Sequence, residues 1–223
     1  MDIDVVTNVL KLNDEIAALN RADLNKAGVR CLDIIGSPGA GKTLLLEKTL
    51  QALQGEMRIG VLTGDLATTR DAERLADHCE KVTQINTGKG CHLDANQVRQ
   101  GLSNFNLEDL DLLIIENVGN LICPVGFDLG QDAKVGLFSV SEGDDKPIKH
   151  PYIVMEASVL ILNKMDLLPY VPFDMKVFDS DLLGLRSDVP VLKLSAATGE
   201  NINEWLDWVR AFVNTKSPAA VLQ

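Results

Sequence analysis

The residues best suited to chemistry form the pattern G-x-x-x-x-G-K-[ST] at positions 36–43: Gly36, Ser37, Pro38, Gly39, Ala40, Gly41, Lys42 and Thr43. An apolar segment precedes the pattern and a helical segment follows it, as a phosphate-binding loop requires. Glycines let backbone N–H groups approach phosphate oxygens, Lys42 reaches the terminal phosphates, and Thr43 offers its hydroxyl to Mg²⁺. The pattern predicts a nucleoside triphosphate bound together with magnesium.

A second group, Asn163, Lys164 and Asp166, indicates which base the nucleotide carries. The Asp166 carboxylate can accept two hydrogen bonds from N1 and N2 of guanine, which adenine cannot donate. These residue types are also common in turns, so the group is informative only because it lies downstream of the phosphate loop. Ser195 and Ala196 follow the next apolar segment and are similar to the loop in which a GTPase backbone amide contacts guanine. The predicted ligands are therefore GTP and GDP.

Several polar side chains could complete the magnesium site. Glu116 ends an apolar segment and, with Gly119, is similar to a D-x-x-G motif, in which the acid positions magnesium or water and the glycine amide contacts the γ-phosphate. Asp65, Asp71 and Thr68 lie in a segment with the composition of a nucleotide-sensing switch. Solvated surface acids explain Asp65 and Asp71 equally well. Together with the lysine and threonine of the phosphate loop, these three acids are the candidate catalytic residues.

The expected activity is hydrolysis of GTP to GDP and phosphate at a slow intrinsic rate. The sequence contains no unambiguous arginine finger and no glutamine placed to orient water. GTPases without these groups turn over far below once per second. An alternative from outside the enzyme class is a non-catalytic scaffold, in which the nucleotide only stabilises a metal-binding protein.

A second metal could bind at Cys91, His92 and Cys123. Thiolate and imidazole suit a borderline or soft cation such as Zn²⁺ or Ni²⁺ rather than Mg²⁺. Three ligands would leave one coordination position open, or would let two subunits share the metal. The residue types alone also fit buried cysteines beside a hydrogen-bonded histidine, because free cysteine is among the most buried residue types.

Apolar segments of strand length must position these motifs, and they lie at 29–35, 58–62, 82–85, 112–115, 135–140, 159–162 and 189–194. Each suits a strand covered on both faces. Helical patterns lie between or beside them, at 5–28, 42–53, 71–78, 93–101 and 201–213. The alternation predicts an α/β P-loop NTPase with a largely parallel sheet of about seven strands, flanked by helices and preceded by an amphipathic N-terminal helix.

We expect the chain, 1–223, to form a single domain: an N-terminal helix at 1–28, a nucleotide-binding domain at 29–215 and a flexible tail at 216–223. The loop at 141–151, which contains glycine, proline and five charged residues, is the expected mobile surface element. The formal net charge of −11 argues against a nucleic-acid partner. No apolar run is long enough to cross a membrane, and the four irregularly spaced cysteines do not form a disulfide framework. A cytoplasmic location is therefore expected.

The motifs together resemble the HypB-type GTPases that assist nickel insertion during [NiFe]-hydrogenase maturation. The resemblance covers nearly the whole chain and is most specific around Cys91 and Cys123, in Asn86-Thr-Gly-Lys-Gly-Cys-His-Leu-Asp-Ala95 and Glu116-Asn-Val-Gly-Asn-Leu-Ile-Cys-Pro124. It also includes two pairs in the leading helix, Asn13-Asp14 and Asn20-Arg21.

The resemblance implies a homodimer that forms with GTP, magnesium at the nucleotide, and a nickel or zinc site built from Cys91, His92 and Cys123 near the dimer interface. It implies two further partners, a HypA-like nickel chaperone and the precursor of a hydrogenase large subunit. It also implies that Lys146 reaches the nucleotide of a second subunit. Many relatives carry an N-terminal cysteine cluster or histidine-rich tract that the sequence lacks, so nickel storage is not expected. The related urease accessory GTPase is a rival, but its Cys-Pro-His metal motif is absent.

Overall fold

The computed structural model describes residues 9–65, 70–88 and 90–215. The strands are β1 (Arg30–Gly36), β2 (Ile59–Asp65), β3 (Lys81–Asn86), β4 (Leu112–Glu116), β5 (Ala133–Ser139), β6 (Val159–Asn163) and β7 (Val191–Lys193). They form one seven-stranded sheet in the order β3-β2-β4-β1-β5-β6-β7. Every neighbouring pair is parallel, so all strands end at the same edge. The predicted parallel sheet is confirmed.

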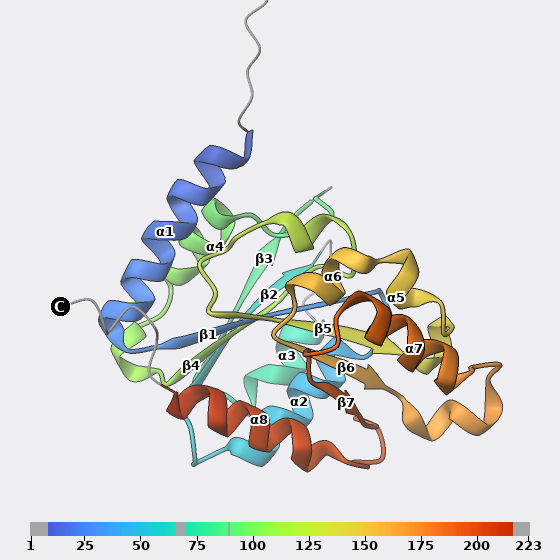
Figure 1. Ribbon diagram of the computed structural model, residues 1–223. Helices are drawn as coiled ribbons and strands as arrows, with labels where there is room; N and C mark the ends of the chain where they lie inside the picture. The colour runs from blue at the N-terminus through green and yellow to red at the C-terminus, as the bar shows by residue number, and fades with distance from the viewer. Residues whose placement is uncertain (1–8, 66–69, 89, 216–223) are drawn as a thin grey trace, which may run out of the picture.

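Helices cover both faces of the sheet (Figure 1). They are α1 (Val9–Ala27), α2 (Lys42–Leu53), α3 (Arg70–Ala76), α4 (Ala95–Leu102), α5 (Lys146–Lys149), α6 (Pro151–Glu156), α7 (Met175–Leu185) and α8 (Ile202–Asn214). Short 3-10 turns lie at Leu107–Asp109, Cys123–Gly126, Val140–Glu142 and Met165–Tyr170. Helices α2, α3 and α8 pack on one face, and α1, α4, α6 and α7 pack on the other.

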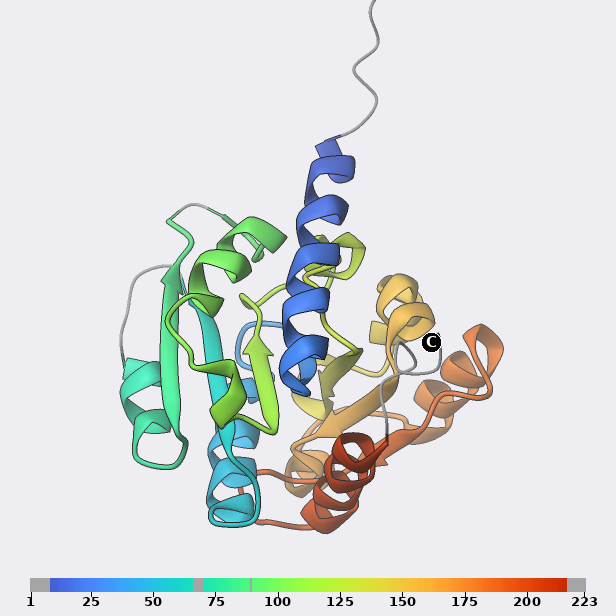
Figure 2. The ribbon, with the colours of Figure 1, turned by 90° about the vertical axis from the view of Figure 1, so that its left-hand side faces the viewer.

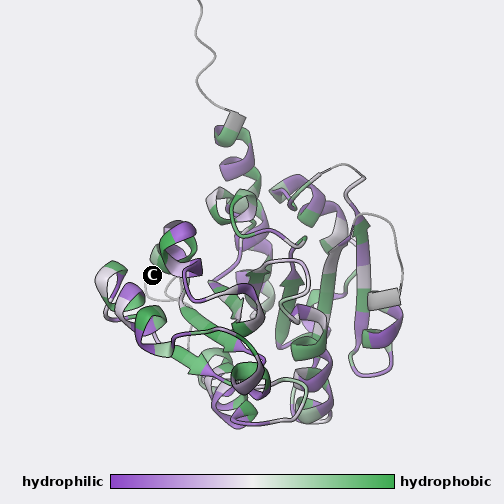
Figure 3. Ribbon diagram, turned by 90° about the vertical axis from the view of Figure 1, so that its right-hand side faces the viewer, coloured by the Kyte–Doolittle hydropathy of each residue, from purple (hydrophilic) through white to green (hydrophobic). Residues whose placement is uncertain are grey.

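Burial follows the position of each strand in the sheet. The central strands are apolar and buried, and they lie between helices in which hydrophilic and hydrophobic residues alternate (Figure 3). The prediction that every strand is covered on both faces is wrong for β3 and β7. These two strands end the sheet, and their residues are half-buried or exposed because each lacks a neighbour on one side.

Helix α1, in the foreground of Figure 2, packs on the sheet through only part of its expected apolar face. The apolar pattern of the helix includes Leu12, Leu19 and Leu24; Leu24 is buried, but Leu12 and Leu19 are 64% and 52% exposed. The buried face also carries Asn13 and Asn20. The Nδ2 of Asn20 donates to the backbone carbonyls of residues 95 and 129, at 2.8 and 3.0 Å, so the buried amide is satisfied. Residues 1–8, where the expected helix began, lie outside the described residues.

The segment 141–151 is more regular than a mobile loop. It contains the end of the turn Val140–Glu142, all of α5 and the first residue of α6. A capping box orders its start, because the Ser139 hydroxyl accepts from a backbone amide and the Glu142 carboxylate accepts from the Ser139 amide. Helix α7 was also missed at the sequence level. No helix in the described part of the chain is long and apolar enough to span a membrane.

Candidate nucleotide site and metal centre

The phosphate-binding pattern forms the loop between β1 and α2. Gly39 and Gly41 have φ values of +77° and +101°, which favour glycine. A Cβ on Gly41 would also lie 2.5 Å from the Nδ2 of Asn163. The loop therefore closes around a cavity of about 440 Å³ at the carboxyl ends of the strands. Parallel α/β sheets bind ligands at this edge.

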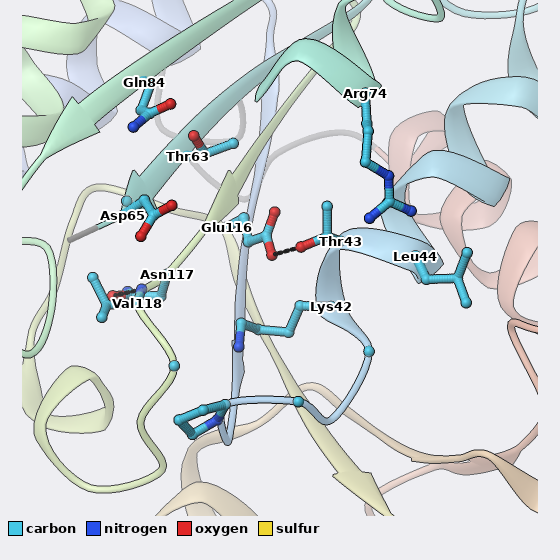
Figure 4. Close-up of a pocket in the computed structure, with 15 residues that line it drawn as sticks. Lys42, Thr43, Leu44, Thr63, Asp65, Arg74, Gln84, Glu116, Asn117 and Val118 are labelled. Atoms are coloured by element: carbon cyan, nitrogen blue, oxygen red, sulfur yellow. Dashed lines mark hydrogen bonds between the residues drawn. The ribbon is translucent and has the colours of Figure 1, made fainter. Parts of the chain in front are cut away.

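Lys42 and Thr43 begin α2 and line this cavity. The Lys42 Nζ is mostly buried and donates to the backbone carbonyls of Gly36 and Ser37, at 3.1 Å each. The Thr43 hydroxyl donates to Oε1 of Glu116 at 2.7 Å (Figure 4). Both side chains are thus held at the cavity by partners that a bound phosphate and cation could replace.

Glu116 and Asp65 end adjacent strands, β4 and β2, and both line the cavity (Figure 4). Asp65 belongs to its strand rather than to the loop after it, so the sheet itself places this acid at the cavity. Asp71 is the second residue of α3, but its side chain, like all of Thr68, lies outside the described residues. Arg74, not singled out from the sequence, also lines the cavity and pairs with Glu47 of α2.

Gly119 lies directly against the phosphate loop. A Cβ at Gly119 would be 2.9 Å from Cα, N and Cγ of Pro38, so any side chain there would displace the loop. The segment that follows Glu116 is therefore in backbone contact with the element that would hold the phosphates.

Two residues of the predicted guanine motif are hydrogen-bonded to the phosphate loop. The Asn163 Nδ2 donates to the Ala40 carbonyl at 2.9 Å, and its Oδ1 accepts from the Ala196 amide at 3.0 Å. Lys164, with a φ of 63°, donates through Nζ to the Gly39 carbonyl at 2.7 Å. These bonds join β6, the loop after β7 and the phosphate loop into one unit.

Asp166 is oriented by Ser195. The Ser195 hydroxyl donates to Oδ1 of Asp166 at 2.5 Å. This bond restrains the orientation of the Asp166 carboxylate. Lys146 begins α5 and is not among the described residues that line the cavity.

Cys91, His92 and Cys123 come together although 32 positions separate the two cysteines. One potential ligand atom from each residue lies within 4.8 Å of the others. The Cys91 Sγ is 3.3 Å from Nδ1 of His92, whose ring lies 4.0 Å from the Phe127 ring, centroid to centroid. The cluster is partly exposed, with Cys91 the most accessible member.

The surroundings of the cluster shift the pKa values of two of its side chains, Cys91 and His92. A hydrogen bond with Cys123 raises the pKa of the Cys91 thiol, with smaller contributions from desolvation and from the neighbouring sulfur. Burial lowers the pKa of His92, which favours the neutral imidazole that binds metals. A soft divalent cation would have to displace the thiol protons, because only thiolates are good metal ligands, so the raised pKa of Cys91 opposes metal binding at low pH.

Comparison with known proteins finds a domain family and relatives that match most of the chain. The domain family described as CobW/HypB/UreG, nucleotide-binding domain, matches residues 31–193. A probable hydrogenase maturation factor HypB from Methanocaldococcus jannaschii is 42% identical over 211 residues, 95% of this chain and 96% of that protein.

Two crystal structures of HypB are closely similar. The hydrogenase maturation factor HypB from Archaeoglobus fulgidus is 40% identical with a TM-score of 0.86, covering 92% of this chain and all of that one. HypB from Helicobacter pylori, solved in complex with nickel, is 33% identical with a TM-score of 0.86, covering 91% of this chain and 95% of that one.

Fold, phosphate loop and domain match define a P-loop protein of the CobW/HypB/UreG nucleotide-binding class. Within that class, the relatives and the solved structures narrow the assignment, and the resemblance inferred from the sequence is confirmed. The chain belongs to the HypB hydrogenase maturation factors.

Proposed function

We propose that this chain is a GTP-hydrolysing nickel carrier that assists nickel insertion into the precursor of a hydrogenase large subunit. One observation carries the proposal. The segment that begins at Glu116 contacts the phosphate loop through Gly119 and four residues later supplies Cys123 to the cysteine and histidine cluster. A nucleotide site and a soft-metal site thus share one short segment.

In this proposal the nucleotide is GTP. Lys42 would leave the two loop carbonyls for the terminal phosphates, and the amides of the phosphate loop would hold the oxygens. Asp166, oriented by Ser195, would accept from N1 and N2 of guanine, and the Ala196 segment would approach the guanine oxygen. Adenine would leave the Asp166 carboxylate without donors, so ATP is disfavoured.

The oxygen ligands at the cavity suit Mg²⁺. Thr43 supplies a hydroxyl, and Glu116 and Asp65 supply carboxylates, all hard donors. When bound, Mg²⁺ neutralises charge on the β- and γ-phosphate oxygens. Thr43 and Glu116 hold each other in place before any ligand arrives, while Asp65 and Asp71 are assigned to the cation or to orientation of the attacking water.

The cargo is assigned to Cys91, His92 and Cys123, and we propose nickel as the physiological ion, with zinc as the alternative. Sulfur and nitrogen ligands accept either ion. The nickel complex of the H. pylori relative favours nickel. Three protein ligands with an exposed thiol suit an ion that must leave again, because a fourth protein ligand would close the site.

We further propose that GTP promotes formation of a homodimer, in which Lys146 reaches the nucleotide of the second subunit. A HypA-like chaperone would exchange nickel with the cluster. The protein would act in the cytoplasm, with residues 1–223 forming a single domain. The tail expected at 216–223 lies outside the described residues.

Phosphate release and metal titration test the two halves of the proposal. The wild type should release phosphate slowly from GTP, and Lys42→Ala should not. If the wild type releases phosphate no faster than the variant, the protein is a non-catalytic scaffold and the proposed hydrolysis is refuted. Nickel binding should be lost in Cys91→Ala and Cys123→Ala. Cys79→Ala is the matched control, since this half-buried thiol lies outside the cluster and donates to the Leu75 carbonyl.

A further inference from the structure

The side chain of Asn120 touches both cysteine-bearing segments of the metal cluster. Its Nδ2 donates to the backbone carbonyl of Cys91 at 3.3 Å. Its Oδ1 accepts from the backbone amides of Ile122 and Cys123, at 2.8 and 3.3 Å. The two halves of this amide therefore fix the distance between the loop that carries Cys91 and the turn that carries Cys123.

The backbone of Asn120 is bonded to the phosphate loop. Its N–H donates to the carbonyl of Gly36 at 3.0 Å. The same carbonyl accepts from the Nζ of Lys42 at 3.1 Å. One oxygen thus receives both the lysine that would bind phosphate and the residue that bridges the cysteines. Withdrawal of Lys42 toward a phosphate would leave Asn120 as the donor to Gly36 in this pair.

Asn117 anchors the other end of the same segment. It is 2% exposed, and its Oδ1 accepts from the backbone amides of Leu93 and Val118 at 3.1 Å each. Its Nδ2 donates to Asp33 in β1 at 3.1 Å. Leu93 in turn packs closely against Gly64, because a Cβ added to Gly64 would lie 2.8 Å from the Cγ of Leu93. The chain after His92 is therefore held to the sheet.

We propose that Asn120 is the positioning residue through which the phosphate loop sets the spacing of Cys91 and Cys123. The inference rests on the proposed function and names the side chain that links its two sites. Because Asn117 holds Leu93 and Val118 to the sheet, a shift at the phosphate loop acts beyond Val118, on Gly119 and Asn120. A shift of Asn120 then changes the distance between the sulfurs of Cys91 and Cys123, and the cluster does not move as one rigid body. The two sites become a two-state element that phosphate and metal both bias.

Two substitutions separate the halves of the Asn120 amide while leaving its backbone bond to Gly36 in place. Asn120→Asp keeps an acceptor for the amides of Ile122 and Cys123 but loses the donor to Cys91. Asn120→Ala loses both. Asn214→Asp, exposed near the end of α8, is the charge-matched control for the first variant.

The measurement is the affinity for Ni²⁺ in saturating GDP and in a saturating non-hydrolysable GTP analogue, at matched dimer concentration. The wild type and Asn214→Asp should show affinities that differ roughly fivefold or more, the lower end of typical allosteric coupling. In Asn120→Asp and Asn120→Ala the ratio should approach one, while affinity for the GTP analogue and the thermal midpoint stay near wild type. A merely structural role would lower nickel affinity equally with both nucleotides and leave the ratio unchanged.

The outcomes separate this inference from the proposed function. A wild-type protein that binds no GTP or no Ni²⁺ would refute the proposed function itself. A wild type that binds both ligands with a ratio of one, or Asn120 variants that keep the wild-type ratio, would overturn the inference alone. If Asn120→Ala unfolds at lower temperature, Asn120→Asp decides the question, because it retains the acceptor that orders the Cys123 turn.

Discussion

A buried carboxyl beneath the nucleotide cavity should make the protein less stable as the pH rises toward neutrality. Asp33 lies within β1 and is completely buried. Its Oδ1 accepts from Asn117, but its Oδ2 has no hydrogen-bond partner among the described residues. Burial raises the pKa of Asp33 from 3.8 to about 7, and the Asn117 hydrogen bond and the charge of Lys134 only partly oppose this rise.

The size of the effect follows from the two pKa values. Between 3.8 and about 7 the folded protein keeps a proton on Asp33 that the unfolded chain has released. The stability that this retained proton contributes is therefore complete below 3.8, the pKa of Asp33 in the unfolded chain. It is lost as the pH rises through about 7, the pKa of Asp33 in the folded protein. Each pH unit in this interval corresponds to about 1.4 kcal/mol, so the loss between pH 5 and pH 8 is roughly 3 kcal/mol.

Asp33→Asn removes the ionisation and keeps both the shape of the side chain and an acceptor for Asn117. Urea unfolding of both proteins at pH 5 and pH 8, without nucleotide or metal, gives the free energy of unfolding free of ligand effects. The wild type minus variant difference should fall by roughly 3 kcal/mol from the lower to the higher pH. Asp77→Asn, at an exposed position, is the control for replacing a carboxylate by an amide. An equal difference for Asp33→Asn at both pH values would refute the reasoning.

Three further predictions concern packing and hydrogen bonds. In Gly119→Ala the new methyl would lie 2.9 Å from the proline of the phosphate loop, so GTP affinity measured by calorimetry should fall about tenfold or more, whereas Gly126→Ala, with open space around the new atom, should bind normally. Ser195→Ala removes the donor to Asp166, and competition binding should show GTP affinity falling about tenfold while the weak affinity for ATP changes little. Asn20→Ala removes the buried amide that donates to the carbonyls of residues 95 and 129, so urea unfolding should show a loss of about 2–3 kcal/mol; an unchanged midpoint would contradict the proposed role of this buried amide.

The parallel sheet was predictable because a strand covered by helices on both faces must be apolar along its whole length. The same signal could not show which strands end the sheet, since β3 and β7 each also contain two apolar residues. The face of α1 was mispredicted in part, for a different reason. Leu12 and Leu19 are seven residues apart, but so are Asn13 and Asn20, and both pairs therefore form a stripe on a helix. The polar stripe is buried because only it can donate to nearby backbone carbonyls.

Within the candidate sites, short motifs located the residues that would touch ligands but not those that connect them. The phosphate loop and the Cys91-His92 pair are contiguous in sequence, so their chemistry is visible there. Asn117 and Asn120 act through backbone groups of distant segments, which no spacing rule reveals. A polar residue that follows an apolar strand segment, as at Asn117, was the one available signal, because a polar group that is buried there must find hydrogen-bond partners.

Helix α1 also connects the two segments that carry Cys91 and Cys123, through hydrogen bonds that lie outside the candidate metal cluster. Asn13 donates to the carbonyl of Asp128 at 2.8 Å and accepts from the amide of Ala95 at 2.9 Å. Asn20 bonds the carbonyls of residues 95 and 129. Ala95 follows the Cys91-His92 pair by a few residues, and residues 128–129 follow the Cys123 turn. Two asparagines of α1 therefore join the segments that carry Cys91, His92 and Cys123 at positions beyond the candidate metal cluster, so the polar stripe of this helix holds these segments together as well as holding α1 to the sheet.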